Sequence, residues 1–253
     1  MKTLVSILFS LLFINLEAQN NLYVEYYTTL NSLSTKGVLI ADRTMAIYNE
    51  GKENFETELS NRINENAIET GNFAPSVVYK TLENPNTIFL DQVYRGINYK
   101  SVDEKPDLDW KFEVPKTFPE LPKTKKIAGY DCLSATVNFR GSTFLAYYTS
   151  DIPTTFGPWK FSGLPGLILE ISSLDNPGIL WVATNVVYPY AEVIDFTLDK
   201  EAFNMSFKDY ILQTEKVDEE HMKILTAKIG NGATFTIEPG RRYLMTRERK
   251  YEW

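Results

Sequence analysis

The chain has 253 residues, of which 43% are hydrophobic, so it is long enough to bury a sizeable core as one large β domain or two small ones. Its formal net charge is −7 and no stripe of basic residues runs along it, which argues against nucleic-acid binding. Its single cysteine, Cys132, excludes an internal disulfide, so the fold depends on its core.

The N-terminus has the layout of a secretory signal peptide. A positive start at Lys2 precedes an apolar run from Leu4 to Ile14, and Leu16-Glu17-Ala18 resembles a small-residue cleavage site. The run is too short to span a bilayer, which takes about 20 apolar residues. We therefore predict that residues 1–18 are removed and that residues 19–253 form a single exported domain without a transmembrane segment. The expected location is the periplasm, the outer membrane or the exterior.

The first half of the mature chain is typical of β-strands interrupted by one polar region. Runs rich in aromatic and β-branched residues predict strands at 22–30, 36–48 (two strands around a turn at 41–44), 76–82, 87–94 and 97–102. Residues 49–75 are polar and contain Gly51 and Gly71, which favours a loop, a frayed helix or a mobile insertion.

Further strands are expected on the way to the centre of the chain. In residues 107–112 Leu108, Trp110 and Phe112 alternate with polar residues, which predicts a half-buried strand. After a connection punctuated by prolines, residues 127–139 and 142–150 are expected to form a hairpin that turns at Arg140-Gly141.

The central loop, Asp151–Ile171, is the stretch around which the chain is organised. It carries three large aromatic residues, Phe156, Trp159 and Phe161, which a purely solvated loop has little reason to contain. It then runs Gly163-Leu164-Pro165-Gly166-Leu167-Ile168. Pro165-Gly166 suits a type II turn, which would place Gly166 at positive φ.

The hexapeptide 163–168 spells GLPGLI, and the chain resembles the GLPGLI family of exported envelope proteins known chiefly from Bacteroidetes-type bacteria. The residues that carry the resemblance are Ile127–Cys132, Ala135, Arg140-Gly141, Ala146–Thr149, Asp151–Pro153, Gly157–Phe161 and Gly163–Ile168. Tyr147 and Ser142 depart from the family pattern, where we expect Trp and a basic residue. The resemblance implies a class of protein and its compartment, and it implies no reaction.

After the loop, strands are expected at 167–172 and 179–188, joined by a turn at Asn176-Pro177-Gly178. The second strand reads as apolar on both faces and is expected to end at Pro189. Apolar residues between 203 and 229 follow a 3.6-residue period, with a break near Val217 and Asp218 as a helix N-cap. The sum is a mainly β fold: an antiparallel, strongly curved sheet or half-open barrel with a helical segment near the C-terminus.

The aromatic loop side chains suggest two roles. Phe156, Trp159 and Phe161, with the GLPGLI residues beside them, either form a binding wall for an apolar ligand or plug one end of the sheet. We expect no metal, cofactor or catalytic residue. His221 stands without a visible nucleophile, and Cys132 lies in an apolar strand pattern.

Three carboxylates around the loop support a second function class. Asp151, Glu170 and Asp175 could supply an acid/base pair if the fold brings them together. The sequence thus favours a non-enzymatic envelope protein that binds an apolar ligand or an outer-membrane partner, with an envelope hydrolase as the alternative. Two carboxylates meeting in an open cleft would favour the enzyme, and an apolar groove would favour binding.

Overall fold

The computed structural model describes residues 21–31, 33–51, 76–105, 110–115, 122–192, 196–229, 247–251 and 253. The expected signal peptide and most of the polar region 49–75 lie outside these residues. Asn49 and Glu50 do not belong to that region, because they complete a β-strand.

Twelve strands form one sheet. They are β1 (Asn21–Leu30), β2 (Leu33–Ala41), β3 (Met45–Glu50), β4 (Ser76–Thr81), β5 (Thr87–Tyr94), β6 (Ile97–Glu104), β7 (Thr124–Ile127), β8 (Tyr130–Phe139), β9 (Ser142–Thr149), β10 (Leu167–Ser173), β11 (Ile179–Tyr190) and β12 (Met205–Ser206). A 3-10 helix, η2 (Lys200–Ala202), and the helix α3 (Phe207–Ile229) follow β11.

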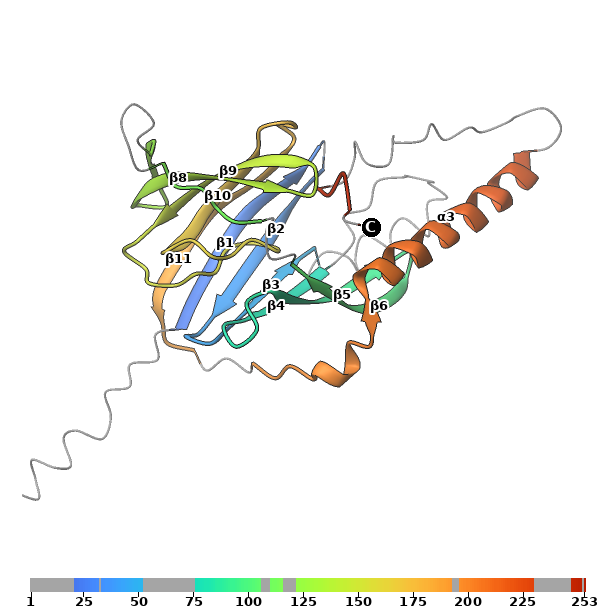
Figure 1. The fold of residues 1–253 in the computed structure, drawn as a ribbon, viewed down its shortest axis with the longest axis horizontal. Helices are drawn as coiled ribbons and strands as arrows, with labels where there is room; N and C mark the ends of the chain where they lie inside the picture. The colour runs from blue at the N-terminus through green and yellow to red at the C-terminus, as the bar shows by residue number, and fades with distance from the viewer. Residues whose placement is uncertain are drawn as a thin grey trace, which may run out of the picture.

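The sheet order is β12-β6-β5-β4-β3-β2-β1-β11-β10-β9-β8-β7. Every neighbouring pair is antiparallel except β12 and β6, which run parallel. The sheet curves strongly, so that β8–β11 with β1 and β2 form one wall and β3–β6 lie at an angle to it (Figure 1). It stays open, because its edge strands β12 and β7 pair only on one side. The mainly β, curved, unclosed fold is therefore confirmed.

The core lies on the inner face of this curved sheet, where alternate side chains of each strand point inward. Tyr26, Tyr48 and Trp181 are completely buried there. Strand β11 shows the alternation clearly: Ile179, Trp181 and Ala183 are buried, while the residues between them are partly exposed. The expectation that this strand is covered on both faces is therefore wrong for residues 179–183.

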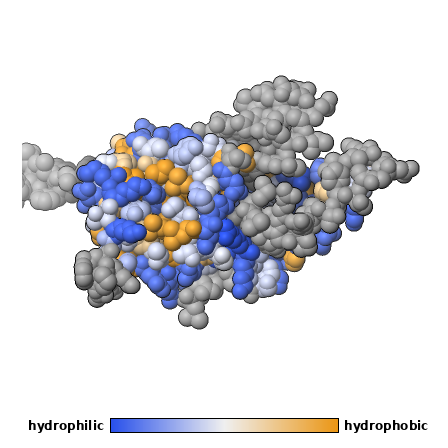
Figure 2. Space-filling model, turned by 90° about the horizontal axis from the view of Figure 1, so that it is seen from above, coloured by the Kyte–Doolittle hydropathy of each residue, from blue (hydrophilic) through white to orange (hydrophobic). Residues whose placement is uncertain are grey.

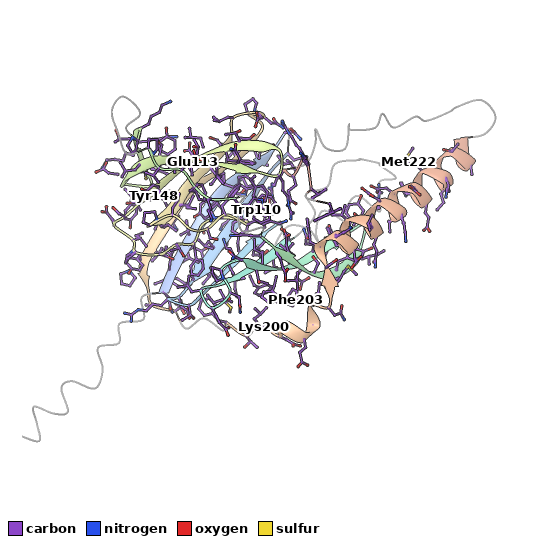
Figure 3. The ribbon with its side chains drawn as sticks, in the orientation of Figure 1. Trp110, Glu113, Tyr148, Lys200, Phe203 and Met222 are labelled. Atoms are coloured by element: carbon purple, nitrogen blue, oxygen red, sulfur yellow. The ribbon has the colours of Figure 1, made fainter. Side chains whose placement is uncertain are left out.

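Two local expectations about strands are corrected by the structure. Strand β11 continues through Pro189 to Tyr190, because Pro189 lies at an irregularity in the pairing with β1, between the Asn21–Tyr190 and Tyr23–Val187 pairs. The described part of 107–112 is not a strand: Trp110 has φ 75°, outside the β region. Trp110 nevertheless lies buried in the body of the molecule (Figure 3).

Helix α3 is continuous and does not break near Val217. Asp218 is not an N-cap but accepts hydrogen bonds from the Tyr94 hydroxyl at 2.6 Å and from Arg95 Nε at 2.9 Å. These partners on the β5–β6 turn satisfy its carboxylate, so the helix can pass through it. The first turns pack on the sheet and the rest, including Met222, projects beyond it (Figures 1 and 3). No helix among the described residues meets the length and hydropathy required to cross a membrane.

Candidate functional site

The central loop is fixed to the sheet by hydrogen bonds from three other strands. Lys80 of β4, which is 3% exposed, donates from Nζ to the carbonyls of Gly157 and Phe161, the second at 3.0 Å. Lys105, directly after β6, donates to Ser162 Oγ at 2.9 Å, and Tyr26 of β1 donates to the Ile168 carbonyl at 2.7 Å. These hydrogen bonds hold the loop in place, so that it forms one wall of the molecule.

Its three aromatic side chains form part of the core. Phe156, Trp159 and Phe161 are 2%, 4% and 3% exposed. The Trp159 ring stacks on Trp181 with centroids 5.5 Å apart, and Phe161 meets the same ring edge to face at 5.6 Å. Leu164, Leu167 and Ile168 are completely buried as well. These buried side chains belong to the core and expose little surface to a ligand.

The requirement for glycine at 166 differs from the one expected. Gly166 is not at positive φ; Gly163 is, with φ 112°. A Cβ built on Gly166 would lie 2.0 Å from the Thr149 carbonyl oxygen and 3.0 Å from Ser150 Cα. The glycine is needed because two backbone segments approach each other there, which excludes any side chain.

A groove opens beside this loop, at the end of the sheet where β1 begins and β2, β4 and β11 end. Its volume is about 460 Å³. Its lining residues are Leu22, Leu82, Ile152, Pro153, Pro165 and Tyr188, with Asp42, Arg43, Thr154 and Thr155 as the polar members. Of the site residues predicted from the sequence, Pro165 alone lines it; the aromatic residues lie behind the wall. Leu82 is 47% exposed and forms part of the opening.

Two of the polar residues that line the groove already accept hydrogen bonds from the protein itself. Asp42 Oδ1 already accepts from the Thr44 amide at 2.6 Å, the Thr44 hydroxyl at 2.8 Å and the Met45 amide at 2.7 Å. Thr154 Oγ1 accepts from the Phe156 amide at 3.3 Å. These contacts stabilise the turn and the loop, so the groove offers mainly apolar surface.

Two of the three candidate carboxylates, Asp151 and Asp175, lie at opposite ends of a strand pair. Asp151 follows the Thr149–Leu167 end of the β9–β10 pair, and Asp175 follows the Phe144–Ser173 end. Five residues of extended strand separate these ends by roughly 17 Å. Asp175 Oδ2 accepts from the Thr143 amide at 2.6 Å. Glu170 is buried and bound by Lys125 Nζ at 2.6 and 2.8 Å. An acid/base pair would need Asp151 and Asp175 much closer.

The thiol and histidine stand apart from the groove. Cys132 is 1% exposed, and burial raises the pKa of its thiol to about 11, which keeps it protonated at neutral pH. His221 directly precedes Met222, which lies on the part of α3 that projects beyond the sheet (Figure 3). The described residues contain no group of three or more His, Cys, Asp or Glu side chains placed to hold a metal ion.

A buried cluster of four charges on the far side of the loop was missed from the sequence. Arg140 donates to Asp103 at 2.7 and 3.1 Å and also to Glu248. Lys160 donates to Asp103 and to Glu248, both at 2.7 Å. Both cationic side chains are 1% exposed. The available signal was Lys160 itself, a lysine between Trp159 and Phe161 in a loop expected to be buried.

Lys105 provides a test of this electrostatic environment. Burial lowers the pKa of Lys105 to about 8, with Asp103 opposing the shift and Lys160 adding to it. Above pH 8 the folded state loses this proton before the unfolded state does, so stability rises until about pH 10.5. We expect Lys105→Met to gain stability relative to wild type at pH 7 and to lose that advantage by pH 10. Urea unfolding at both pH values measures it, and an equal difference at both would contradict it.

Comparisons with known proteins give one short family match and a likeness of fold. A family described as "Protein of unknown function (Porph_ging)" matches residues 140–170, a window that contains the GLPGLI hexapeptide. No curated protein matches the chain.

Among solved structures, the fold is similar to that of PNGF-II in its C2 and P21 crystal forms, each with a TM-score of 0.50 and 17% identity over 77% of this chain. The chain spans about a third of the length of PNGF-II (33% and 34%). At this identity the likeness shows the fold alone. MucB in complex with MucA(peri) matches with 12% identity over 70% of this chain and 53% of that chain, but its TM-score of 0.29 supports no argument.

Proposed function

We propose that the mature chain is an exported envelope protein of the GLPGLI type that binds an apolar ligand, without catalysis, in the groove beside the central loop. The observation that carries this proposal is the groove itself. Its volume of about 460 Å³ falls within the usual range of small-molecule sites, about 300–1,000 Å³, and most of its lining is apolar.

The separation of the carboxylates supports binding over hydrolysis. General acid/base catalysis needs two ionisable groups that reach the same substrate atoms. Asp151 and Asp175 lie at opposite ends of a strand pair, and Glu170 is held by Lys125. An outer-membrane protein that inserts an apolar side chain into the groove is the other occupant consistent with its chemistry. On the face seen from above, Figure 2 shows hydrophobic patches set within hydrophilic surface.

A charge placed at the mouth of the groove should remove binding and leave the fold intact. Leu82→Asp puts a carboxylate against apolar surface, and we expect the affinity for an apolar dye such as Nile red to fall about tenfold or more. Its melting temperature should change little, because Leu82 is 47% exposed.

Leu174→Asp is the matched control, since Leu174 is 58% exposed and does not line the groove. Fluorescence titration of both variants measures the effect. Equal dye affinity in the two variants, or none in wild type, would reject the groove as the binding site.

Export provides a separate test of the compartment. The sequence layout of residues 1–18 leads us to expect cleavage near Ala18. Mass spectrometry of the protein from its native host should find a new N-terminus around Gln19. A mature pool that retains Met1 would exclude signal cleavage.

A further inference from the structure

The buried side chains of Arg140 and Lys160 form a subsite for a carboxylate. Arg140 and Lys160 are two buried cations that share Asp103 as a partner. Buried charges are stable only when they are paired, so this site gains from a second carboxylate. Glu248 supplies it: Lys160 donates to its Oε1 at 2.7 Å, and Arg140 donates to the same atom.

A subsite for a cation lies one residue away. Glu50 at the end of β3 is 1% exposed, and Arg247 donates to its two oxygens at 2.9 and 2.5 Å. The same guanidinium lies over the Trp181 ring, 4.5 Å from its centroid, and over Trp159 at 5.4 Å. A carboxylate facing two indole rings favours a planar cation.

A backbone and aromatic subsite completes the series. The Arg140 carbonyl accepts from the amides of Arg249 and Lys250, at 2.9 and 3.0 Å. Gly141 permits this approach, because a Cβ there would lie 3.0 Å from Lys250 Cβ. Phe207, at the start of α3, meets Tyr251 edge to face, with ring centroids 6.0 Å apart. Tyr251 in turn stacks on Trp253 at 4.9 Å.

We propose that these subsites form a peptide-recognition site, and that its partner is an extended segment in which a basic and an acidic residue are followed, after two further residues, by an aromatic residue, with a second aromatic residue two positions later. In this structure the C-terminal segment Arg247–Trp253 is the occupant. It joins α3 through residues 230–246, and Figure 1 shows it beside the sheet, away from the far end of the helix. The segment reaches the site as a tethered ligand, and a partner with the same pattern competes for it.

The tether sets the terms of that competition. A peptide linked by a short chain has an effective concentration on the order of millimolar at its own site. A free peptide therefore binds the uncut protein weakly and binds well once the tether is cut. The groove beside the central loop is a different site. Binding of a peptide to these subsites is therefore independent of whether the groove binds an apolar ligand.

The test uses the full chain with a protease recognition sequence inserted between residues 230 and 246, cut after folding. A fluorescein-labelled peptide with the sequence of residues 247–253 is then titrated and followed by anisotropy. We expect saturable exchange with the resident segment in the cut protein and at least about tenfold weaker binding to the uncut protein.

Two peptide variants give the specificity. A peptide carrying Glu248→Gln should bind about tenfold or more weakly, since Arg140 and Lys160 lose a charged partner. A peptide carrying Lys250→Ala is the matched control, because the Lys250 side chain is exposed, and it should bind like the parent. The proposal is overturned if the cut protein unfolds or never exchanges its segment, or if the Glu248→Gln peptide binds as well as the parent.

Discussion

Gly166→Val is expected to prevent folding or to lower the melting temperature by more than any other single change in the central loop. The new side chain would begin 2.0 Å from the Thr149 carbonyl oxygen and would meet Ser150 Cα at 3.0 Å. Both obstacles are backbone atoms, which cannot move aside as a flexible side chain would. Relief requires separating the end of β9 from the start of β10, where the loop is anchored.

Trp159→Ala tests the same wall by removing packing. Trp159 is 4% exposed and stacks on Trp181. Loss of a large aromatic side chain from such a site costs about 3–5 kcal/mol, which is comparable to the net stability of many domains, about 5–15 kcal/mol. Thermal melts of the purified variants measure both effects, with the exposed Asp151→Asn as the control of small effect. If Trp159→Ala melted like wild type and lost ligand binding, the ring would be a ligand contact.

Asp103→Asn is expected to have the second large effect. Asp103 is 2% exposed and accepts from Arg140 at 2.7 and 3.1 Å and from Lys160 at 2.7 Å. The amide removes the negative charge and leaves two buried cations with weaker partners, which costs about 3–5 kcal/mol where one partner of a buried pair is removed.

Urea unfolding of Asp103→Asn measures this loss. Asp131→Asn is the matched control: Asp131 pairs with Lys126 at 3.3 Å, but its side chain is 85% exposed, so the change should fall within about 0.5 kcal/mol. Equal stability of the two variants would mean that water enters the cluster and screens its charges.

Some of the features behind these predictions could be recognised in the sequence, and others could not. Most strands were predictable because they are runs rich in aromatic and β-branched residues, as Leu22–Leu30 is, and that signal is local. The turns at Arg140-Gly141 and Asn176–Gly178 were predictable because Gly and Pro specify backbone angles residue by residue. The period of the helix was visible too, yet the expected break at Val217 was wrong, because Asp218 finds its partners on a distant turn.

The candidate site was less visible, for a physical reason. The sequence directed attention to Phe156, Trp159 and Phe161, but the structure uses their apolar surface for the core and opens the groove on the other side of the loop. Of the groove's residues, Asp42 and Arg43 come from one turn and Leu82 and Tyr188 from the ends of two other strands. No local pattern marks residues that meet only after the sheet has curved.

Local patterns in the sequence were enough to indicate a mainly β chain with an aromatic central loop, because hydrophobic periods and the angles of Gly and Pro act within a few residues. The need for glycine at position 166 is visible only in the folded protein, since it depends on the backbone at Thr149. The tertiary structure likewise decided that Asp103, Arg140, Lys160 and Glu248 share one buried site. Charges far apart in the chain can be buried only where the fold brings them into contact, and that contact depends on the whole sheet.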